Sequence, residues 1–323
     1  MPIGSSSIPW RKKRNGAGLP VAAVSEARIT RRRSALNNTA SLTIFRALPG
    51  DLATRDSQDL MAYPFFSLAK SKRTTPITFQ TKDVYVRVEG THEHGIATIW
   101  DADVLIWAAS QIVEARDQGL PTSRLMAATP YEILRFVGRG TGNQQYDRLK
   151  AALDRLQSTT IATSIRQAAA RRLHRFSWIN EWRERTDALG RPDGISLILP
   201  DWFYSGLLDS SLVLTLDPVY FTLTGGIERW LYRLVRKHAG RQHAGWQFDF
   251  GYLYEKSGSA MRSSDFSRYL RRIATDQALP GFTLHVERTR SGREFLRFRR
   301  RAHPPVATLI RGLTQQLKFG DKL

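Results

Sequence analysis

An internal repeat with a spacing of 120 residues constrains the fold more than any other feature of the sequence. Each copy has the same order of five features, namely helix, helix, glycine-containing turn, helix and hairpin. A shared order of this length is harder to obtain by chance than any one of its parts. We therefore expect two related α+β domains, with a chance similarity of two helical domains as the alternative. The residues that coincide are Ile133 with Leu253, Gly138 with Gly258, Tyr146 with Phe266, Arg148 with Arg268, and Leu153 with Ile273.

The second copy is clearest over residues 262–301, where a predicted helix precedes a basic hairpin. Phe266, Leu270 and Ile273 recur at the spacing of one face of an α-helix. Two alternating apolar runs follow and are joined by a turn at residues 291–292. A helix packed by one face beside a basic hairpin is typical of a winged helix. We predict two tandem winged-helix domains related by a pseudo-repeat. The alternative is an ordinary corner of a helix and two strands whose arginines are simply solvated.

In the first copy, residues 143–157 form the predicted third helix, and a turn with three glycines over residues 138–142 precedes it. These glycines are not followed by Lys and then Ser or Thr, so the pattern does not match a phosphate-binding loop. Residues 78–88 alternate as a strand does, and residues 191–194 have the composition of a turn.

Composition divides the chain into four segments. Residues 1–58 contain basic clusters and no sustained periodicity, so we predict a flexible basic arm there. The arm could add phosphate contacts, and an inert segment is the alternative. We place the first winged-helix domain at residues 59–207, the second at residues 208–303 and a C-terminal tail at residues 304–323.

The charge balance favours a polyanionic partner. The chain of 323 residues has 49 Lys and Arg against 29 Asp and Glu, a formal net charge of +20. Such an excess repels itself in the compact state, and nucleic acid is the usual partner that explains it. An anionic membrane surface is the competing partner, but no apolar run approaches the roughly 18 residues of a spanning helix. We expect a cytoplasmic protein with no membrane partner. The absence of cysteine excludes disulfides and Cys-ligated metal sites.

Several segments resemble one known family. The chain is similar to the replication initiator protein A family, plasmid-borne initiators that are built from tandem winged-helix domains. The most specific match is D-S-Q-D-L-M-A-Y-P-F-F-S-L-A-K-S-K-R-T-T-P-I. This segment covers residues 56–77, and the other matching segments are residues 96–112, 146–156, 197–203 and 216–234.

The resemblance implies a function as well as a fold. Members of such a family bind repeated sites at a plasmid origin in double-stranded DNA, open the adjacent A·T-rich duplex and recruit the host replication initiator and helicase. They often repress their own gene as homodimers and start replication as monomers. By position, the recognition helices would be residues 143–157 and 262–277.

In a winged helix the third helix lies in the major groove, and the hairpin contacts phosphates. Arg268 and Arg271 are the first candidates for guanine, and Gln144 and Gln145 for adenine. The first unit has a less basic third helix and could serve dimerisation as much as readout. Two units on successive major grooves predict a footprint of about two helical turns. The predicted DNA-binding residues are Asn143, Gln144, Gln145, Arg148, Arg155, Arg262, Ser264, Arg268, Arg271, Arg272, Arg288, Arg290, Arg293 and Arg299.

Catalytic and metal sites are not expected. His92 and His94 invite comparison with nicking initiators, but they lie in a G-T-H-E-H-G segment that predicts a hairpin turn. No Ser, His and Asp grouping or carboxylate pair has a suggestive setting, so we expect no enzyme activity and no cofactor. Two functional alternatives remain, a winged-helix transcriptional repressor without a replication role and a basic structural or membrane-surface protein.

Overall fold

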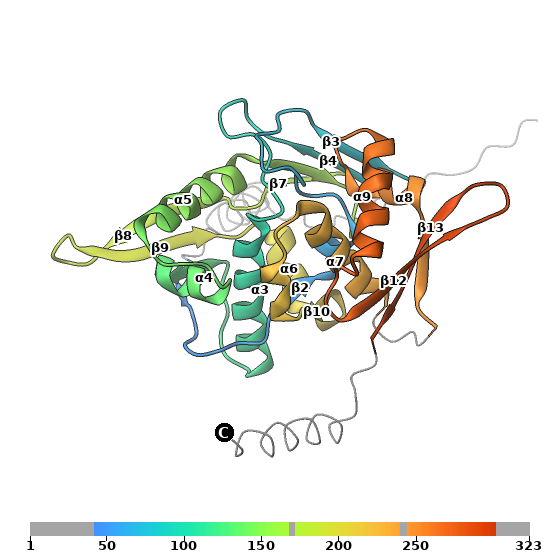
Figure 1. Cartoon of the computed structure of the whole chain (residues 1–323). Helices are drawn as coiled ribbons and strands as arrows, with labels where there is room; N and C mark the ends of the chain where they lie inside the picture. Colours follow the sequence, from blue (N-terminus) through green and yellow to red (C-terminus); the bar gives the residue numbers. More distant parts are fainter. Residues whose placement is uncertain (1–41, 168–171, 240–243, 302–323) are drawn as a thin grey trace, which may run out of the picture. The chain divides into compact units, whose positions relative to one another are not determined.

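The structure is a computed structural model that describes residues 42–167, 172–239 and 244–301 (Figure 1). The predicted C-terminal tail and residues 1–41 of the predicted arm lie outside this described part. From residue 43 onward, the described residues belong to one compact unit that mixes helices and strands. None of the described helices combines the length and the apolar character needed to span a bilayer.

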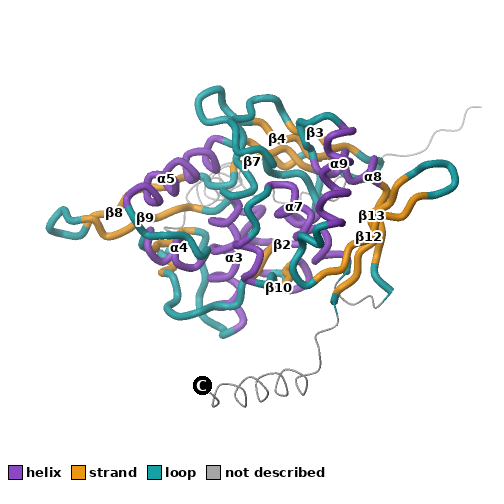
Figure 2. The backbone as a smooth tube through the Cα atoms, in the orientation of Figure 1, coloured by secondary structure: helices purple, strands orange, loops and turns teal. Residues whose placement is uncertain are grey.

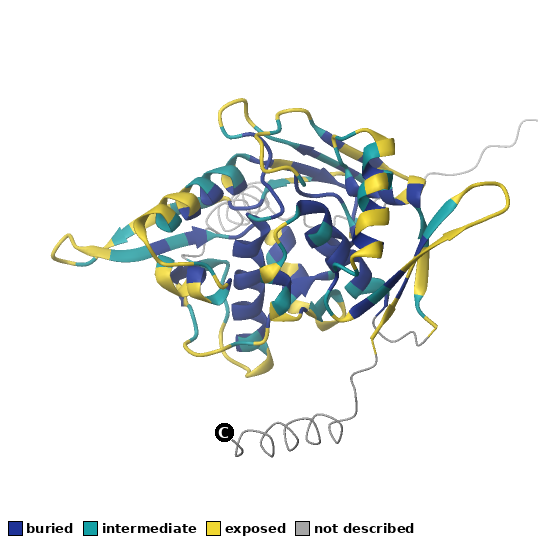
Figure 3. Ribbon diagram, viewed as in Figure 1, coloured by how far each residue is buried: buried dark blue, intermediate teal, exposed yellow. Residues whose placement is uncertain are grey.

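The first half of this unit surrounds one helix, α3 (Ala102–Asp117), which is buried on almost every side (Figure 3). A helix that is apolar all round belongs in the centre of a core. It shares a hydrophobic cluster with the sheet of order β1-β5-β9-β8. The main elements here are β1 (Phe45–Arg46), β2 (Arg55–Ser57), α2 (Gln58–Ala62), β5 (Leu125–Ala128), α4 (Pro130–Phe136), α5 (Asn143–Ser158), β8 (Glu181–Thr186), β9 (Pro192–Ile198) and α6 (Asp201–Leu208).

A second antiparallel sheet in this half has the order β3-β4-β6-β7. Two of its strands, β6 (Thr160–Thr163) and β7 (His174–Ser177), are inserted between α5 and β8. The other two are β3 (Ile77–Gln80) and β4 (Tyr85–Glu89). The first half therefore carries more structure between its third helix and its hairpin than the second half does.

The second half repeats the order of helix, strand, two helices and hairpin. Its sheet has the order β11-β13-β12, and Figure 1 shows the hairpin projecting beyond the helices. Its elements are η1 (Ser210–Leu212), β10 (Val213–Thr215), η2 (Pro218–Thr222), α7 (Gly226–His238), β11 (Trp246–Asp249), α8 (Phe250–Ser257), α9 (Ser263–Thr275), β12 (Phe282–Arg288) and β13 (Glu294–Arg300).

The spacing of 120 residues relates the helices of the two halves. Pro130 and Phe250 begin α4 and α8, and Asn143 and Ser263 begin α5 and α9. In each half the strand before the paired helices, β5 or β11, pairs antiparallel with the last strand of the hairpin, which is β9 or β13. The hairpins are only about 100 residues apart, because β6 and β7 lengthen the first half. Figure 2 shows both hairpins, β8 with β9 and β12 with β13, as pairs of orange strands.

Local chemistry explains where the short helices begin and end. The Thr129 hydroxyl accepts from the Glu132 amide at 3.2 Å, and the Glu132 carboxylate accepts from the Thr129 amide at 2.7 Å. This reciprocal cap starts α4 and satisfies amides that have no partner within the helix. Gly138 and Gly258 follow α4 and α8 with φ of 67° and 60°. That left-handed conformation favours glycine, so both copies keep it at the turn.

Each half has its own hydrophobic cluster, and the second cluster reaches into the first half. The second cluster draws most of its residues from positions 216–298, and it also contains Met61 of α2 and Ile106 of α3. The contacts between α2 and α7 and the pairing of β2 with β10 join the halves further. The domain boundaries given by composition stay a prediction.

The prediction of a single strand at residues 78–88 is wrong. The segment is the hairpin of β3 and β4, in which Phe79 lies opposite Val86. The Thr81 amide donates to the Val84 carbonyl at 2.8 Å, and this bond closes a tight turn in the middle of the segment. The apolar alternation of two short strands had been interpreted as one strand.

The predicted turn at residues 191–194 lies four residues earlier. Asp187 organises the turn, because its carboxylate accepts from the amides of Leu189 at 2.8 Å and Arg191 at 2.9 Å. Pro192 then begins β9. Gly194 is needed inside this strand, because a Cβ there would lie 2.5 Å from the Ala128 carbonyl oxygen.

Candidate nucleic-acid interface

Helix α9 has a buried apolar face and an exposed polar face. Phe266, Leu270 and Ile273 are buried, and the Phe266 ring lies 5.5 Å from the Tyr254 ring of α8. Arg268 lies on the other face with 78% of its side chain exposed, and its only ion pair within the described residues is an exposed one with Asp265 at 3.5 Å. Exposed pairs of this kind contribute about 0 to 1 kcal/mol. The Arg268 guanidinium is therefore available to an incoming ligand.

Arg271, the second candidate for base readout, is bound by the Glu294 carboxylate of the hairpin. Arg271 of α9 donates through Nε and Nη2 to the two Glu294 oxygens at 3.0 and 2.6 Å. Arg288 of β12 donates to the same carboxylate at 2.9 Å. Hydrogen bonds from Arg271 and Arg288 lower the pKa of Glu294 to about 2. Glu294 thus ties the helix to the hairpin and fixes the direction of both guanidinium groups.

The remaining predicted residues of this half are also exposed. The Arg272 guanidinium lies over the Tyr269 ring at 4.3 Å. Arg293 forms only a long ion pair with Asp249 at 3.5 Å. The predicted DNA-binding arginines of the α9 helix region and its hairpin are here called the α9 surface, which comprises Arg262, Arg268, Arg271, Arg272, Arg288, Arg290, Arg293 and Arg299.

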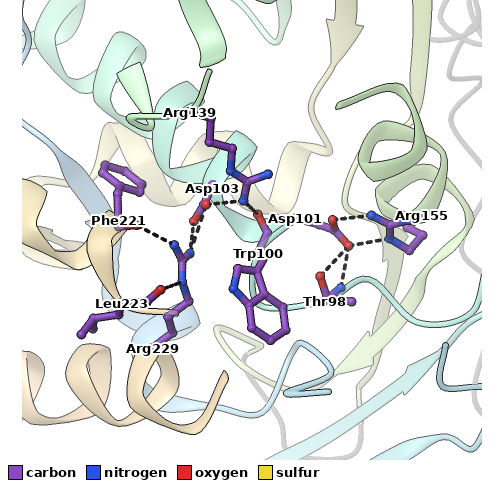
Figure 4. Close-up of polar contacts among 9 residues, drawn as sticks. All are labelled: Thr98, Trp100, Asp101, Asp103, Arg139, Arg155, Phe221, Leu223 and Arg229. Atoms are coloured by element: carbon purple, nitrogen blue, oxygen red, sulfur yellow. Dashed lines mark hydrogen bonds and ion pairs between the residues drawn. The ribbon is translucent and has the colours of Figure 1, made fainter. Parts of the chain in front are cut away.

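Helix α5 presents a different arrangement of its predicted residues. Asn143, Gln144 and Arg148 are exposed, and Gln145 is half-buried. Arg155 is instead bound to Asp101, with Nε at 2.8 Å and Nη2 at 2.7 Å from the carboxylate oxygens (Figure 4). This bidentate pair occupies the guanidinium edge that a guanine would need. The structure therefore gives Arg155 an internal role, and its contact with DNA stays a prediction that competes with this pair.

Asp101 and Asp103 at the start of α3 organise the centre of the molecule (Figure 4). Asp101 also accepts from the Thr98 amide at 2.7 Å. Asp103 accepts from Arg139 at 2.8 Å and from Arg229 at 2.8 and 3.1 Å. Arg139 belongs to the turn before α5, and Arg229 belongs to α7. Two neighbouring carboxylates thus position α5, its turn and the first helix of the second half.

A second buried ion pair joins β2 to α7. The Arg233 guanidinium donates to the Asp56 carboxylate at 2.7 and 3.0 Å, and both side chains are at most 2% exposed. Sequence reasoning missed this pair and the network at Asp103. The available signal was the presence of isolated acidic and basic residues inside otherwise apolar segments.

A groove of about 1020 Å³ runs beside α5. A stripe of α5 lines it, together with two loops around residues 70–72 and 93–94 and residues between 221 and 229. We call this the α5 groove. Its lining includes Gln145, Arg148, Ala151, Asp154 and Arg155 of α5, Lys70, Lys72, Glu93 and His94 of the loops, and Thr98, Trp100, Asp101, Arg139, Phe221, Leu223, Thr224 and Arg229.

The histidine pair lies in a turn. The Gly95 amide donates to the Thr91 carbonyl at 2.8 Å, which closes the segment that contains His92 and His94. Within the described residues, no group of three or more His, Asp or Glu side chains is placed to hold a metal ion.

The comparisons with known proteins agree with this structure. Residues 55–284 match the model of a family described as Replication initiator protein A. The chain belongs to this family. The family resemblance predicted from the sequence is thereby confirmed, and a role in replication initiation follows from membership. A protein of Wigglesworthia glossinidia brevipalpis named "Putative replication protein" is 28% identical over 228 residues, which cover 69% of this chain and 82% of that protein.

Solved structures of domains 2 and 3 of RctB share the fold. One matches with a TM-score of 0.55 and 13% identity over 75% of this chain and 98% of the RctB chain. A second matches with a TM-score of 0.50 and 13% identity over 76% and 97% of the two chains. These matches confirm the predicted α+β class for this member of the replication initiator protein A family.

Proposed function

We propose that this member of the family is a sequence-specific DNA-binding initiator that binds repeated sites at a plasmid origin through the α9 surface. The observation that carries the proposal is the exposed arginine face of α9 beside a basic hairpin. In a chain with a net charge of +20, this face combines side chains that can pair with bases and side chains that can neutralise phosphates.

The order of elements supports a winged-helix interpretation of the second half. In α7, β11, α8, α9, β12 and β13, the third helix precedes a hairpin whose last strand pairs with the first strand. A helix presented in this way enters the major groove, where an arginine can pair bidentately with guanine. Arg268 is the best placed residue, because it is exposed and holds no strong internal partner. Arg290 and Arg299 suit phosphate contacts.

Further steps of initiation belong to the same proposal. We propose that binding promotes opening of adjacent A·T-rich DNA and recruits the host initiator and helicase, and that a homodimer represses the gene. The chain then acts in the cytoplasm by binding alone, without catalysis and without a cofactor. The same order of elements in the first half supports a tandem winged-helix architecture.

Footprinting of the full chain on DNA that flanks its own gene tests the proposal. The experiment uses a salt series, with a probe of unpaired bases in the same reactions. We expect protected direct repeats, and a reactive A·T-rich stretch beside them once the host initiator is added. Arg268→Ala should weaken protection of the repeats, whereas Lys82→Ala on the exposed turn between β3 and β4 should not.

Two other results would contradict the initiator. Protection without opening, even with the host initiator present, would indicate a repressor. Binding that disappears with salt and prefers no sequence would indicate a purely electrostatic contact.

A further inference from the structure

The α5 groove differs in kind from the α9 surface. Residues Gln145, Arg148 and Ala151 form a stripe along α5, and this stripe lines the groove. The loops of residues 70–72 and 93–94 line the same groove. A recognition helix must protrude to enter a major groove that is about 12 Å wide. This stripe of α5 instead borders a hollow that it shares with two loops of the same molecule.

The cations of the groove fall into two groups. Arg139, Arg155 and Arg229 line the groove and are bound to the carboxylates of Asp101 and Asp103. Lys70, Lys72 and Arg148 are exposed and have no carboxylate partner among the described residues. The first group fixes the elements that line the groove. Glu93 and Asp154 line it as well, yet the lining holds six Lys and Arg against three Asp and Glu, so an excess of positive charge remains.

An aromatic ring lies in the groove beside one of these lysines. The Lys70 ammonium is 5.4 Å from the centre of the Trp100 ring. Gly226 makes room for this ring, because a Cβ there would lie 3.1 Å from the Trp100 ring edge and 2.0 Å from the Leu68 carbonyl oxygen. Because a ring rather than a carboxylate holds Lys70, its charge is not neutralised. Phe221 adds a second aromatic side chain to the lining.

The size of the groove limits what it can hold. At about 1020 Å³ it lies at the upper end of the range of roughly 300 to 1,000 Å³ that is usual for ligand sites. This space suits a few nucleotides of one strand. A positive groove with aromatic side chains is the arrangement by which proteins bind single strands without sequence preference.

We propose that the α5 groove binds a short segment of a single DNA strand, with Lys70, Lys72 and Arg148 contacting phosphates. The proposal rests on the proposed function, because an unpaired strand appears where the duplex next to the bound sites opens. The two halves then bind different forms of the DNA. The α9 surface holds the duplex, and the α5 groove retains one strand of the opened region.

The test measures binding of the full chain to a labelled 12-nucleotide strand and, separately, to a duplex that carries a protected repeat. Lys70→Gln, Lys72→Gln and Arg148→Gln are compared with the matched exposed variant Lys82→Gln. We expect each groove variant to weaken strand binding several-fold, and to reduce the slope of log K against log salt by about 0.7. Duplex affinity should stay unchanged in Lys70→Gln, Lys72→Gln and Lys82→Gln, and thermal unfolding checks that each variant is folded.

The possible outcomes separate this inference from the proposed function. If the wild-type chain prefers the repeat duplex but does not bind the strand, or if the groove variants bind the strand as Lys82→Gln does, the groove assignment is overturned alone. Loss of strand and duplex binding together in Arg268→Ala would also overturn it, because one surface would then serve both. If the wild-type chain shows no preference for the repeat duplex, the proposed function itself fails. A 12-nucleotide RNA that binds more tightly than the DNA would overturn the assignment to DNA.

Discussion

Helices α5 and α9 occupy corresponding places in the two halves, yet they present different chemistry. At the spacing of 120 residues, Arg271 and Arg272 of α9 coincide with Ala151 and Ala152 of α5. The α9 arginines face solvent, whereas Ala151 lines a groove. The shared order of elements therefore fixes where the third helix lies, and a few substitutions decide what it can bind.

The largest expected effect concerns stability and the buried ion pair that connects the two halves. Replacing Asp56 by Ala leaves the Arg233 guanidinium buried without a partner. Removing one member of a buried pair costs about 3 to 5 kcal/mol, so we expect a loss of that size in the free energy of unfolding. Urea unfolding measures it. Asp56→Leu with Arg233→Met should recover much of the loss, and a loss below about 1 kcal/mol would show that the pair does not hold the halves together.

The second prediction compares two arginines that coincide in the repeat. Arg268→Ala should reduce the difference in binding free energy between the preferred duplex and a duplex with one changed base pair by about 1 to 3 kcal/mol. Arg148→Ala at the corresponding place in α5 should leave this preference unchanged, because its side chain borders the α5 groove. Competition binding with the two duplexes measures the difference. An equal loss of preference in both variants would show that α5 and α9 do not differ in duplex recognition.

The third prediction concerns the carboxylate that holds Arg271. Glu294→Ala frees Arg271 and Arg288, so we expect affinity for unrelated DNA to rise a few-fold while the preference for the specific site falls. Glu287→Ala is the matched control, because it also removes one carboxylate from the hairpin and frees Arg297, its partner at 3.1 Å. If both variants change the preference equally, Glu294 acts only through its charge.

The fourth prediction is a pH dependence of stability that arises from Lys256 in the second half. Lys256 of α8 is 5% exposed among aromatic rings, and burial followed by the charge of Lys237 lowers its pKa to about 8. Between about pH 8 and 10 the unfolded chain keeps a proton that the folded chain has lost, so this residue makes stability rise with pH. Lys256→Met should remove that rise, which urea unfolding at several pH values measures. The coinciding residue in the first half is Phe136, which does not titrate.

Sequence patterns predicted the helices better than the contacts between them. The apolar stripes and glycine turns of α4, α5, α8 and α9 gave the repeat, because these signals lie within about 30 residues of sequence. The pair of Asp56 and Arg233 spans 177 residues, and local periodicity contains no information about it. The hairpin at residues 78–88 does leave a local signal, since the apolar positions change from odd at Phe79 to even at Val84 and Val86 across the turn closed by Thr81.

The residues of the candidate site also differ in whether the sequence could predict their contacts. The exposure of Arg268 follows from its place opposite the apolar stripe, so the sequence could predict it. The internal partner of Arg155 could not be predicted, because the Asp101 carboxylate comes from a helix 54 residues away in sequence. The α5 groove could not be predicted either, because α5 and the loops that line it come together only in the folded chain.

Because the chain has no cysteine, one introduced thiol carries a reagent to a single place, and this allows the most direct test of the central claim. Gln145→Cys puts a DNA-cleaving iron chelate in the α5 groove, and Ser264→Cys puts it on α9. On a partly opened origin fragment, we predict that the reagent on residue 264 cuts within the duplex repeats and that the reagent on residue 145 cuts only the unpaired strand. Cleavage of the duplex repeats from both positions would contradict the assignment of the duplex to α9 and of the unpaired strand to α5.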